Sequence, residues 1–565
     1  MFSATSQPAL QRRFLLLGWV LLAAIPVIYI GSKVVAASRN IVFWDEFDTA
    51  LALILRINAG AEWPELLQRF FAMNNEHRTV TSRLIFAISY WLTGTVNFHV
   101  IGAIGNLFLV GACATLILAV RTWERRIRLG VVLAFLVFQL ENFENFIWSG
   151  ASIDHFQVVM LGVVAIAALA HGTGAGCILA GIFGLLATFT LAQGSVVWPA
   201  GALLLWHQRR WNQLAGWCAG GGVAIAAFLH GFEFNPGHNI SEITLQSITH
   251  VVRYWLALLG GPLTLGDAGF APFPGLVLLA GFGVLVARGA LAREPALTFS
   301  AFFAMGSLAL VAFGRSELAG AEINSRYMVL GGLAWAVFVF LLVELGTQPE
   351  KPLRLLLCLL PALVAFNVSA NVRFAPKVEA FVEMRDRAAT RFKQYGEDGR
   401  GISRLHPQLG HADVMLKMAQ DRGVYQLPRV SDPVRVPAPK PSTRIITHVD
   451  ELIVNDRALT VGGWAMIPGR TSNRGDVHLV LRSEKSFLVF TALTLQRPDV
   501  ATAYKEPKWR LAGFRAVIRR TRLPAENFEV GVLITGDDEA EFIMTPNRLD
   551  LTTPGGNAVR PPGAQ

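Results

Sequence analysis

The sequence predicts a polytopic α-helical membrane protein with a small all-β domain near its C-terminal end. Hydrophobic residues make up 53% of the 565 positions and charged residues only 16%, whereas a soluble globular protein carries about 25% charged residues. The mean hydropathy is +0.44. Long apolar runs recur as far as about residue 370, and short alternating patterns follow beyond residue 440. These observations exclude an ordinary water-soluble fold.

About eleven apolar segments are the expected membrane spans. The first follows Arg12 and Arg13 and lacks a clear small-residue cleavage site, so we expect a retained helix and not a cleaved leader. Several later segments are shorter than the roughly 20 residues that a crossing needs. The segments lie near residues 14–35, 98–120, 129–140, 155–171, 173–192, 195–206, 214–231, 273–291, 296–314, 328–346 and 353–370.

The connectors between these segments alternate in charge, which predicts the orientation of the chain. The Lys and Arg residues gather in every second connector, as expected of cytoplasmic connectors. With a cytoplasmic N-terminus, the multi-pass chain would lie in a bacterial inner (plasma) membrane with its C-terminal domain in the periplasm. The formal charge of +10 is scattered through these connectors, so no nucleic-acid partner is expected. The basic connectors are 121–128, 208–210, 288–293 and 351–354; the opposite ones are 141–154, 231–270 and 314–327.

The first outer loop, residues 37–97, is expected to contain two or three helices that lie along the membrane surface. The segment Val80 to Leu92 is apolar enough to resemble a span, but counting it would move the basic connector 121–128 to the outer side. We therefore expect an amphipathic interfacial helix with Arg83, Tyr90 and Trp91 at headgroup depth. Residues 47–57 and 63–72 are interpreted in the same way.

Four regions follow from these patterns. Residues 1–370 form the transmembrane domain, and 371–440 form a helical and Pro-rich linker. Alternating patterns at 459–464, 477–481, 487–490 and 528–534 predict a β-sandwich over residues 441–555. Residues 556–565 are expected to be a disordered tail.

Two stretches of the first outer loop carry groups suited to chemistry. Asp45 and Glu46 are adjacent carboxylates close to the exit of the first span, and carboxylates at membrane depth usually line a cavity or do proton or ion work. The alternative is that Asp45 caps a helix. His77 and Arg78 precede the interfacial helix at Val80, where they form either the rim of a site or part of a solvated loop.

Other candidates lie at the outer ends of later spans. Arg326 and Tyr327 open a late helix, where a guanidinium can fork onto a phosphate or, with Tyr327, act as an ordinary interface anchor. Asp154 and His155 could line the same cavity, although each is individually more typical of a helix end. The same holds for three weaker signals, which are Glu141 to Asn145 with Trp148, Gln193, and Trp198.

This arrangement resembles the GT-C superfamily of membrane glycosyltransferases, which includes protein O-mannosyltransferases and lipid A aminoarabinose transferases. Asp45-Glu46 matches the acidic motif of the family's first loop. The segment 77–94 takes the place of its His-Pro-Pro-Leu interfacial helix without either proline, and 97–126 is similar to the second span with its Arg-Arg end. Ser325 to Met328 is similar to the Arg-Tyr opening of a late helix. The resemblance covers residues 10–370, and the missing prolines leave the subfamily open.

The resemblance implies a polyprenyl-phosphate-linked sugar as donor and a periplasmic glycan, lipid or protein as acceptor at the cell envelope. Asp45 would be the general base of an inverting displacement and Glu46 its partner or an alternate base. Arg326, assisted by Arg78 or Arg253, would hold the leaving phosphate, and His77 would hold the phosphate or sugar. Some superfamily members use a divalent cation such as Mg²⁺ or Mn²⁺, but no ligand set in this sequence demands one.

Two other functions remain open at this point. A transporter or flippase for a lipid-linked saccharide would use its cavity carboxylates to bind or couple ions, although neither inverted repeats nor broken helices are evident. A non-catalytic membrane anchor would display the β-domain to bind a glycan.

Overall fold

The computed structural model describes the chain in two compact units. Unit 1 comprises Met1–Glu383 and Met418–Gln426, and unit 2 comprises Met384–Lys417 and Leu427–Gln565. Unit 1 is helical and unit 2 holds the strands. The described residues are 7–232, 244–316, 322–345, 352–395, 405–406, 409–427, 440–456, 458–469, 477–520, 523–535, 540–553 and 557–559.

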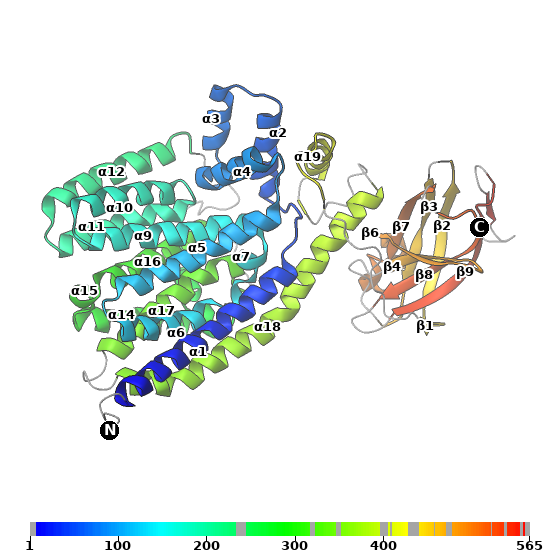
Figure 1. Cartoon of the computed structure of the whole chain (residues 1–565). Coiled ribbons are helices and arrows are strands. Elements are labelled where there is room, and N and C mark those ends of the chain that lie inside the picture. The colour runs from blue at the N-terminus through cyan, green and yellow to red at the C-terminus, as the bar shows by residue number, and fades with distance from the viewer. Residues whose placement is uncertain are drawn as a thin grey trace. The chain divides into compact units, whose positions relative to one another are not determined.

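Long apolar helices make up most of unit 1 (Figure 1). Each of the eleven apolar segments expected from the sequence falls in one of them. The longer helices are α1 (Gln7–Ala37), α5 (Phe98–Ala119), α6 (Trp123–Val137), α9 (Gln157–Ala170), α10 (Gly174–Thr188), α11 (Val197–His207), α12 (Trp211–Leu229), α13 (Leu245–Gly260), α14 (Pro272–Ala287), α16 (Pro295–Arg315), α17 (Met328–Leu345) and α18 (Pro352–Tyr395).

Six helical stretches among the described residues are long and apolar enough to cross a membrane. Two shorter apolar helices, α10 and α14, accompany them. A lipid bilayer is therefore the environment of unit 1, whereas the total of eleven crossings stays a prediction. The six stretches are Leu16–Ala37, Phe98–Ala119, Ser149–Ala170, Pro295–Arg315, Ser325–Leu345 and Pro352–Asp386.

Helix α13 corrects the expected connector 231–270, of which residues 233–243 lie outside the described part. Its last four residues, Ala257 to Gly260, are buried, and the helix packs against α14 and α16. The helix was not expected from the sequence, because exposed polar residues in its first turns interrupt the apolar pattern. A capping box between Thr244 and Ser247 starts it, and Gly331 of α17 approaches the Leu258 carbonyl so closely that a Cβ atom there would lie 3.0 Å away.

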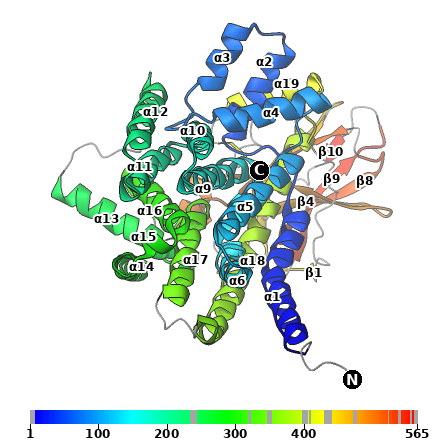
Figure 2. The same ribbon diagram turned by 60° about the vertical axis from the view of Figure 1, so that its left-hand side comes forward.

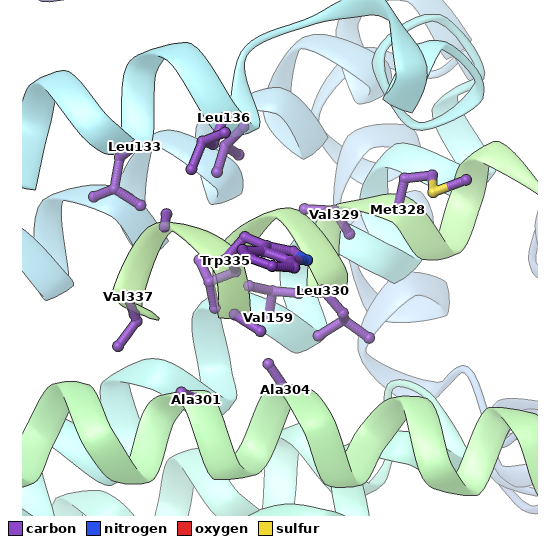
Figure 3. Close-up of a cluster of buried hydrophobic side chains, with 14 of the residues drawn as sticks. Leu133, Leu136, Val159, Ala301, Ala304, Met328, Val329, Leu330, Trp335 and Val337 are labelled. Carbon is purple, nitrogen blue, oxygen red and sulfur yellow. The ribbon is translucent and has the colours of Figure 1, made fainter. Parts of the chain in front are cut away.

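The core of unit 1 is built around α17. Figure 3 shows Leu133 and Leu136 of α6 on one side of it and Ala301 and Ala304 of α16 on the other. The Trp335 indole lies among them and donates a hydrogen bond to a backbone carbonyl of α13 at 2.8 Å. Small residues let these helices approach closely, as is usual in membrane proteins.

An ion-pair network joins the ends of α6 and α17 at one end of the helices. Arg125 contacts Glu294 at 2.6 Å and Glu344 at 2.8 Å, and Arg128 contacts Glu344 at 2.7 Å. Burial raises the pKa of the Glu294 carboxyl, although the Arg125 charge opposes the shift. The candidate site residues described below lie at the opposite ends of these helices, as the alternating connectors predict.

Three short helices of the first loop lie together at one end of the bundle in both views (Figures 1 and 2). They are α2 (Ala52–Asn58), α3 (Trp63–Phe71) and α4 (Val80–Thr93). Trp63, Leu67 and Phe71 form an exposed apolar stripe on α3, and Trp91 is 50% exposed on α4. Exposed apolar side chains of this kind are typical of amphipathic helices, and the position of these helices along the membrane surface stays a prediction.

Arg83 corrects one detail of that expectation. Its side chain is 1% exposed and donates to the carbonyls of Phe70 and Ala72, at 2.9 and 2.5 Å. Burial lowers the pKa of its guanidinium to about 10. Arg83 therefore caps the C-terminal end of α3 from inside the protein and does not face lipid headgroups.

The segment expected as a linker, 371–440, is partly built into unit 1. Helix α18 continues without a break to Tyr395. Asn371 also accepts a hydrogen bond from Leu140 N at 3.0 Å. Farther along, Tyr425 accepts a hydrogen bond from Val42 N at 3.1 Å and donates one to Asn40 O at 2.9 Å. These contacts could not be predicted from local patterns, because their partners lie far away in the chain. Of the four prolines in the expected Pro-rich part of the linker, only Pro441 lies among the described residues.

Unit 2 contains two β-sheets packed around one apolar core. One sheet has the order β1-β9-β8-β4-β5, with β10 beside β9, and the other has the order β2-β3-β7-β6. All four strand patterns expected from the sequence lie in strands. The expected disordered tail, residues 556–565, instead forms strand β10 over Asn557–Val559. Its remaining residues lie outside the described part. The strands are β1 (Lys440–Pro441), β2 (Ile446–Val454), β3 (Ala458–Met466), β4 (Val477–Arg482), β5 (Phe487–Thr491), β6 (Leu493–Leu495), β7 (Gly513–Arg519), β8 (Asn527–Thr535), β9 (Ala540–Asp550) and β10.

Candidate functional site

Glu46 is a buried structural group. Its side chain is fully buried, and its two oxygens accept hydrogen bonds from Phe43 N at 2.7 Å and Gly150 N at 2.6 Å. The Ser149 hydroxyl donates a further bond to it. Ser149 and Gly150 are the first residues of a helical stretch, where a carboxylate is stabilised by unpaired N–H groups and by the helix dipole. These contacts favour a role for Glu46 in joining the first loop to that helix over a role as a base.

Asp45 and Arg326 lie close enough to interact electrostatically, although they are far apart in the sequence. The charges of Glu144, Asp45 and Asp154 all act on the Arg326 guanidinium. Asp45 is only partly buried, so an acceptor can reach its carboxylate. The fold thus brings together the two residues on which the sequence interpretation depends.

The Arg326 guanidinium is held loosely by its neighbours. Its Nε atom donates to the Asn324 side chain at 3.2 Å and lies 3.9 Å from a Glu144 carboxylate oxygen. The guanidinium also lies 5.2 Å from the centre of the Trp148 ring, in a cation–π contact. A long ion pair with one carboxylate leaves the planar fork able to accept a second anion.

Asp154 and His155 join this site on an unusual helical turn. They belong to a π-helical segment, Ser152–Phe156, and a second one, Phe47–Leu51, begins directly after Glu46. Such π-turns are rare and occur often at functional sites. The Ser82 hydroxyl donates a hydrogen bond to the Asp154 carboxylate. The His155 ring lies 5.8 Å from that of Tyr327, in an edge-on contact.

His77 contributes a neutral imidazole to the same place. Its Nδ1 atom accepts a hydrogen bond from Ala192 N at 3.2 Å, which leaves the proton on Nε2. Burial lowers its pKa to about 4, helped by the charge of Arg315 and opposed by Glu76. At neutral pH, His77 can therefore donate a hydrogen bond to an anion without carrying charge. We call Asp45, His77, Asp154, His155 and Arg326 the Arg326 cluster.

Arg315 is a neighbour of this cluster that the sequence interpretation missed. It ends α16 and forms an ion pair with Glu76 at 2.7 Å, and its charge acts on both His77 and His155. A signal was present, because Arg315 is a basic residue at the end of an apolar segment. It was overlooked because its connector is otherwise poor in basic residues.

Strained backbone marks both parts of the first loop that reach the cluster. Trp44 and Asn75 have positive φ angles of 48° and 50°, which are uncommon for residues with side chains and costly for Trp. Trp44 directly precedes Asp45, and Asn75 precedes Glu76 and His77. Such conformations cluster at functional sites, and here they directly precede the candidate acids and imidazole of the first loop.

Several buried polar atoms around the cluster have no hydrogen-bond partner in the described protein. They include Trp148 Nε1, His155 Nδ1 and Asn145 Oδ1. Glu141 Oε1 is another, and burial raises the pKa of the Glu141 carboxyl well above its ordinary value. Buried polar groups are nearly always hydrogen-bonded. These atoms therefore indicate a place where a polar ligand or water completes the bonding.

Arg78 and Arg253, which were expected to assist Arg326 in binding an anion, do not take part in the Arg326 cluster. Arg78 donates to the carbonyls of Phe228, at 2.8 Å, and of Phe71 and His230. All its nitrogens thus clamp backbone at the ends of α3 and α12, which corrects its expected role as an assistant to Arg326. Arg253 is exposed on α13, and none of the interactions described for the cluster involves it.

The other weak signals divide in the same way. Asn145 donates a hydrogen bond to the Arg326 carbonyl at 2.9 Å, so the segment 141–148 does border the cluster. Trp198 packs on Trp217 with ring centres 4.5 Å apart and is part of an apolar core. Gln193 is buried, and its carbonyl accepts a hydrogen bond from Ser307 at 3.1 Å.

The described residues contain no group of three or more His, Cys, Asp or Glu side chains that could hold a metal ion. The charges of the cluster acids Asp45 and Asp154 act on the Arg326 guanidinium. The reaction proposed below uses this guanidinium and assigns no role to Mg²⁺ or Mn²⁺.

Comparison of the chain with protein-family models, with curated proteins and with solved structures finds no match.

Proposed function

We propose that the chain is a membrane glycosyltransferase. It would transfer a sugar from a polyprenyl-phosphate-linked donor to a hydroxyl of a glycan, lipid or protein on the outer side of a bacterial inner membrane. The observation that carries the proposal is that the Asp45 charge acts on the Arg326 guanidinium at the end of an apolar helix. A base and an anion-binding cation at membrane depth are the two groups that such a transfer needs.

In the proposed reaction, the acceptor oxygen attacks C1 of the sugar from the face opposite the phosphate. The new C1–O bond forms as the bond from C1 to the phosphate oxygen breaks, and the acceptor proton passes to the Asp45 carboxylate. The lipid phosphate leaves with the bonding electron pair, so the configuration at C1 inverts. Asp154 lies in the same cluster and would position the acceptor or sugar hydroxyls.

Negative charge builds on the phosphate during this step, so donors directed at it lower the barrier. Arg326 is the candidate cation because its ion pair with Glu144 is long, at 3.9 Å. His77 is a neutral donor beside it, with a pKa of about 4. Tyr327 and His155 would form the wall of this site.

The decisive experiment is an assay in reconstituted vesicles that contain undecaprenyl phosphate linked to labelled glucose, mannose or galactose. The protein is supplied as wild type, Asp45→Asn or Asp48→Asn. Asp48 is the matched control because it is a carboxylate on the same loop whose charge acts on Arg69 and Arg83, outside the Arg326 cluster. We expect the wild type and Asp48→Asn to form a new glycosidic bond and Asp45→Asn to form none while remaining folded.

Other outcomes would refute the proposal. Movement of intact labelled lipid across the bilayer without a new bond would indicate a carrier. Full transfer by Asp45→Asn would remove Asp45 from the mechanism. Deleting residues 441–565 separates the third function, because a transferase keeps its chemistry whereas an anchor loses its role.

A further inference from the structure

The outer face of the smaller sheet of unit 2 carries an aromatic group next to a strip of charged side chains. On β3, Leu459, Val461 and Ala465 point into the core of the unit, so the intervening Trp464 points outward. Trp464 pairs with His448 of β2 and Gly513 of β7. Directly paired residues share a face of a sheet, so His448 lies beside the Trp464 ring.

Helix α20 (Pro498–Ala503) and the turn after it add two more rings. Tyr504 lies 5.5 Å from Trp464 and 4.9 Å from Trp509, measured between ring centres. Trp509 is only 7% exposed and anchors the group, whereas Tyr504 is 46% exposed. The result is a rigid aromatic surface supported by a buried indole.

A network of charged side chains borders these rings. Arg497 donates to both oxygens of Asp499, at 2.9 and 2.7 Å, and also to Asp450. His448 lies 3.7 Å from the other oxygen of Asp450. Gly513 leaves room for this arrangement, since a Cβ atom there would lie 2.7 Å from Arg497 Cγ. The planar groups are thus fixed against the sheet next to the aromatic surface.

We infer that this face, defined by His448, Asp450, Trp464, Arg497 and Tyr504, binds a saccharide. One face of a pyranose ring presents C–H groups, which pack on the electron-rich face of an aromatic ring. The hydroxyls at its edge can donate hydrogen bonds to the carboxylates of the network and accept them from its guanidinium. Because acids and bases alternate in the network, it favours an uncharged glycan over a nucleic acid or a polyanion.

The inference does not depend on the proposed transferase activity, because every residue that it uses belongs to unit 2. It assigns a glycan-binding role to a defined surface of the β-domain. In a transferase such a surface would retain the glycan product or acceptor; in an anchor it would be the principal binding site.

The test uses the full chain in nanodiscs, because detergents with sugar headgroups would compete. Cellotetraose, mannotetraose, chitotetraose and galactotetraose are added separately, and binding is measured by saturation-transfer NMR and titration. We expect at least one tetrasaccharide to bind, with dissociation constants at least tenfold weaker for Tyr504→Ala and Trp464→Ala. Tyr504→Phe keeps the ring and should keep most of the affinity.

Phe487→Ala is the matched control, because Phe487 is a 42% exposed ring on the other sheet, 5.5 Å from Phe542. It should bind as the wild type does. The inference fails if none of the four saccharides binds, or if Phe487→Ala weakens binding as much as Tyr504→Ala. It also fails if Tyr504→Ala lowers the melting temperature of the protein but leaves the affinity unchanged, because the rings would then serve only the fold.

Discussion

Replacing Glu46 by Gln separates the two adjacent acids of the first loop. The Glu46 carboxylate accepts from Phe43 N at 2.7 Å, from Gly150 N at 2.6 Å and from the Ser149 hydroxyl, and it is fully buried. A glutamine side chain has the same shape but only one acceptor oxygen. Whichever way the amide turns, its NH₂ group faces one of the two backbone N–H groups.

The expected cost follows from these contacts. Hydrogen bonds to charged groups contribute about 1.5–3 kcal/mol each, and a buried donor left without an acceptor costs a similar amount. Losing one such bond should therefore destabilise the protein by about 2–3 kcal/mol. At about 2.1 cal/mol/K of unfolding entropy per residue, each kcal/mol lowers the melting temperature of this 565-residue chain by about 1 °C. We expect a decrease of about 2–3 °C for Glu46→Gln.

The assay is thermal unfolding in detergent followed by size-exclusion chromatography, with transfer measured at a temperature where both proteins are folded. Asp45→Asn is the comparison, because Asp45 is partly exposed and Arg326 keeps its contact with Glu144. We expect Asp45→Asn to melt within about 1 °C of the wild type and to be inactive. The reasoning is refuted if Glu46→Gln melts like the wild type and is inactive, because Glu46 would then be the reacting acid.

Three further predictions concern other groups of unit 1. Arg326→Lys keeps the charge but loses the planar fork, so we expect transfer to fall by at least tenfold with little change in stability; unchanged activity would argue against phosphate binding there. The His77 pKa of about 4 lies below the ordinary 6.5, so the unfolded chain binds more protons than the folded chain between these pH values. The melting temperature should therefore fall as the pH drops from 6.5 to 4. His77→Gln should make the melting temperature depend less on pH in this range. Glu344→Gln removes the carboxylate that Arg125 and Arg128 share, and it should destabilise the protein by about 3 kcal/mol. The control is Glu529→Gln, in a largely exposed pair with Arg482, which should change the free energy of unfolding by less than about 1 kcal/mol.

The apolar segments and the strands could be predicted from the sequence because their signals are local. A run of apolar residues of sufficient length favours a helix in lipid whatever surrounds it. Alternating residues bounded by turns favour strands in the same way. Helix α13 escaped prediction because polar residues such as Thr249 and His250 interrupt its apolar pattern, and it becomes part of the bundle through contacts with α14 and α16.

The candidate site was predictable as a set of residue types but not as a set of roles. Asp45 and Glu46 are adjacent acids in the sequence, and nothing local distinguishes them. In the fold, Glu46 lies at the start of the helical stretch Ser149–Ala170, and the Asp45 charge acts on Arg326. Arg78 was equally ambiguous until its three carbonyl partners were known.

The sequence by itself determined that the chain is a membrane protein with a β-domain, since composition and periodicity specify what each segment must bury. Only the tertiary structure decided which polar side chain serves the fold and which is available to a ligand. The physical reason is that a buried carboxylate or guanidinium must find a partner. That partner is supplied by segments distant in the chain, as Gly150 is for the Glu46 carboxylate and the Phe228 carbonyl is for the Arg78 guanidinium.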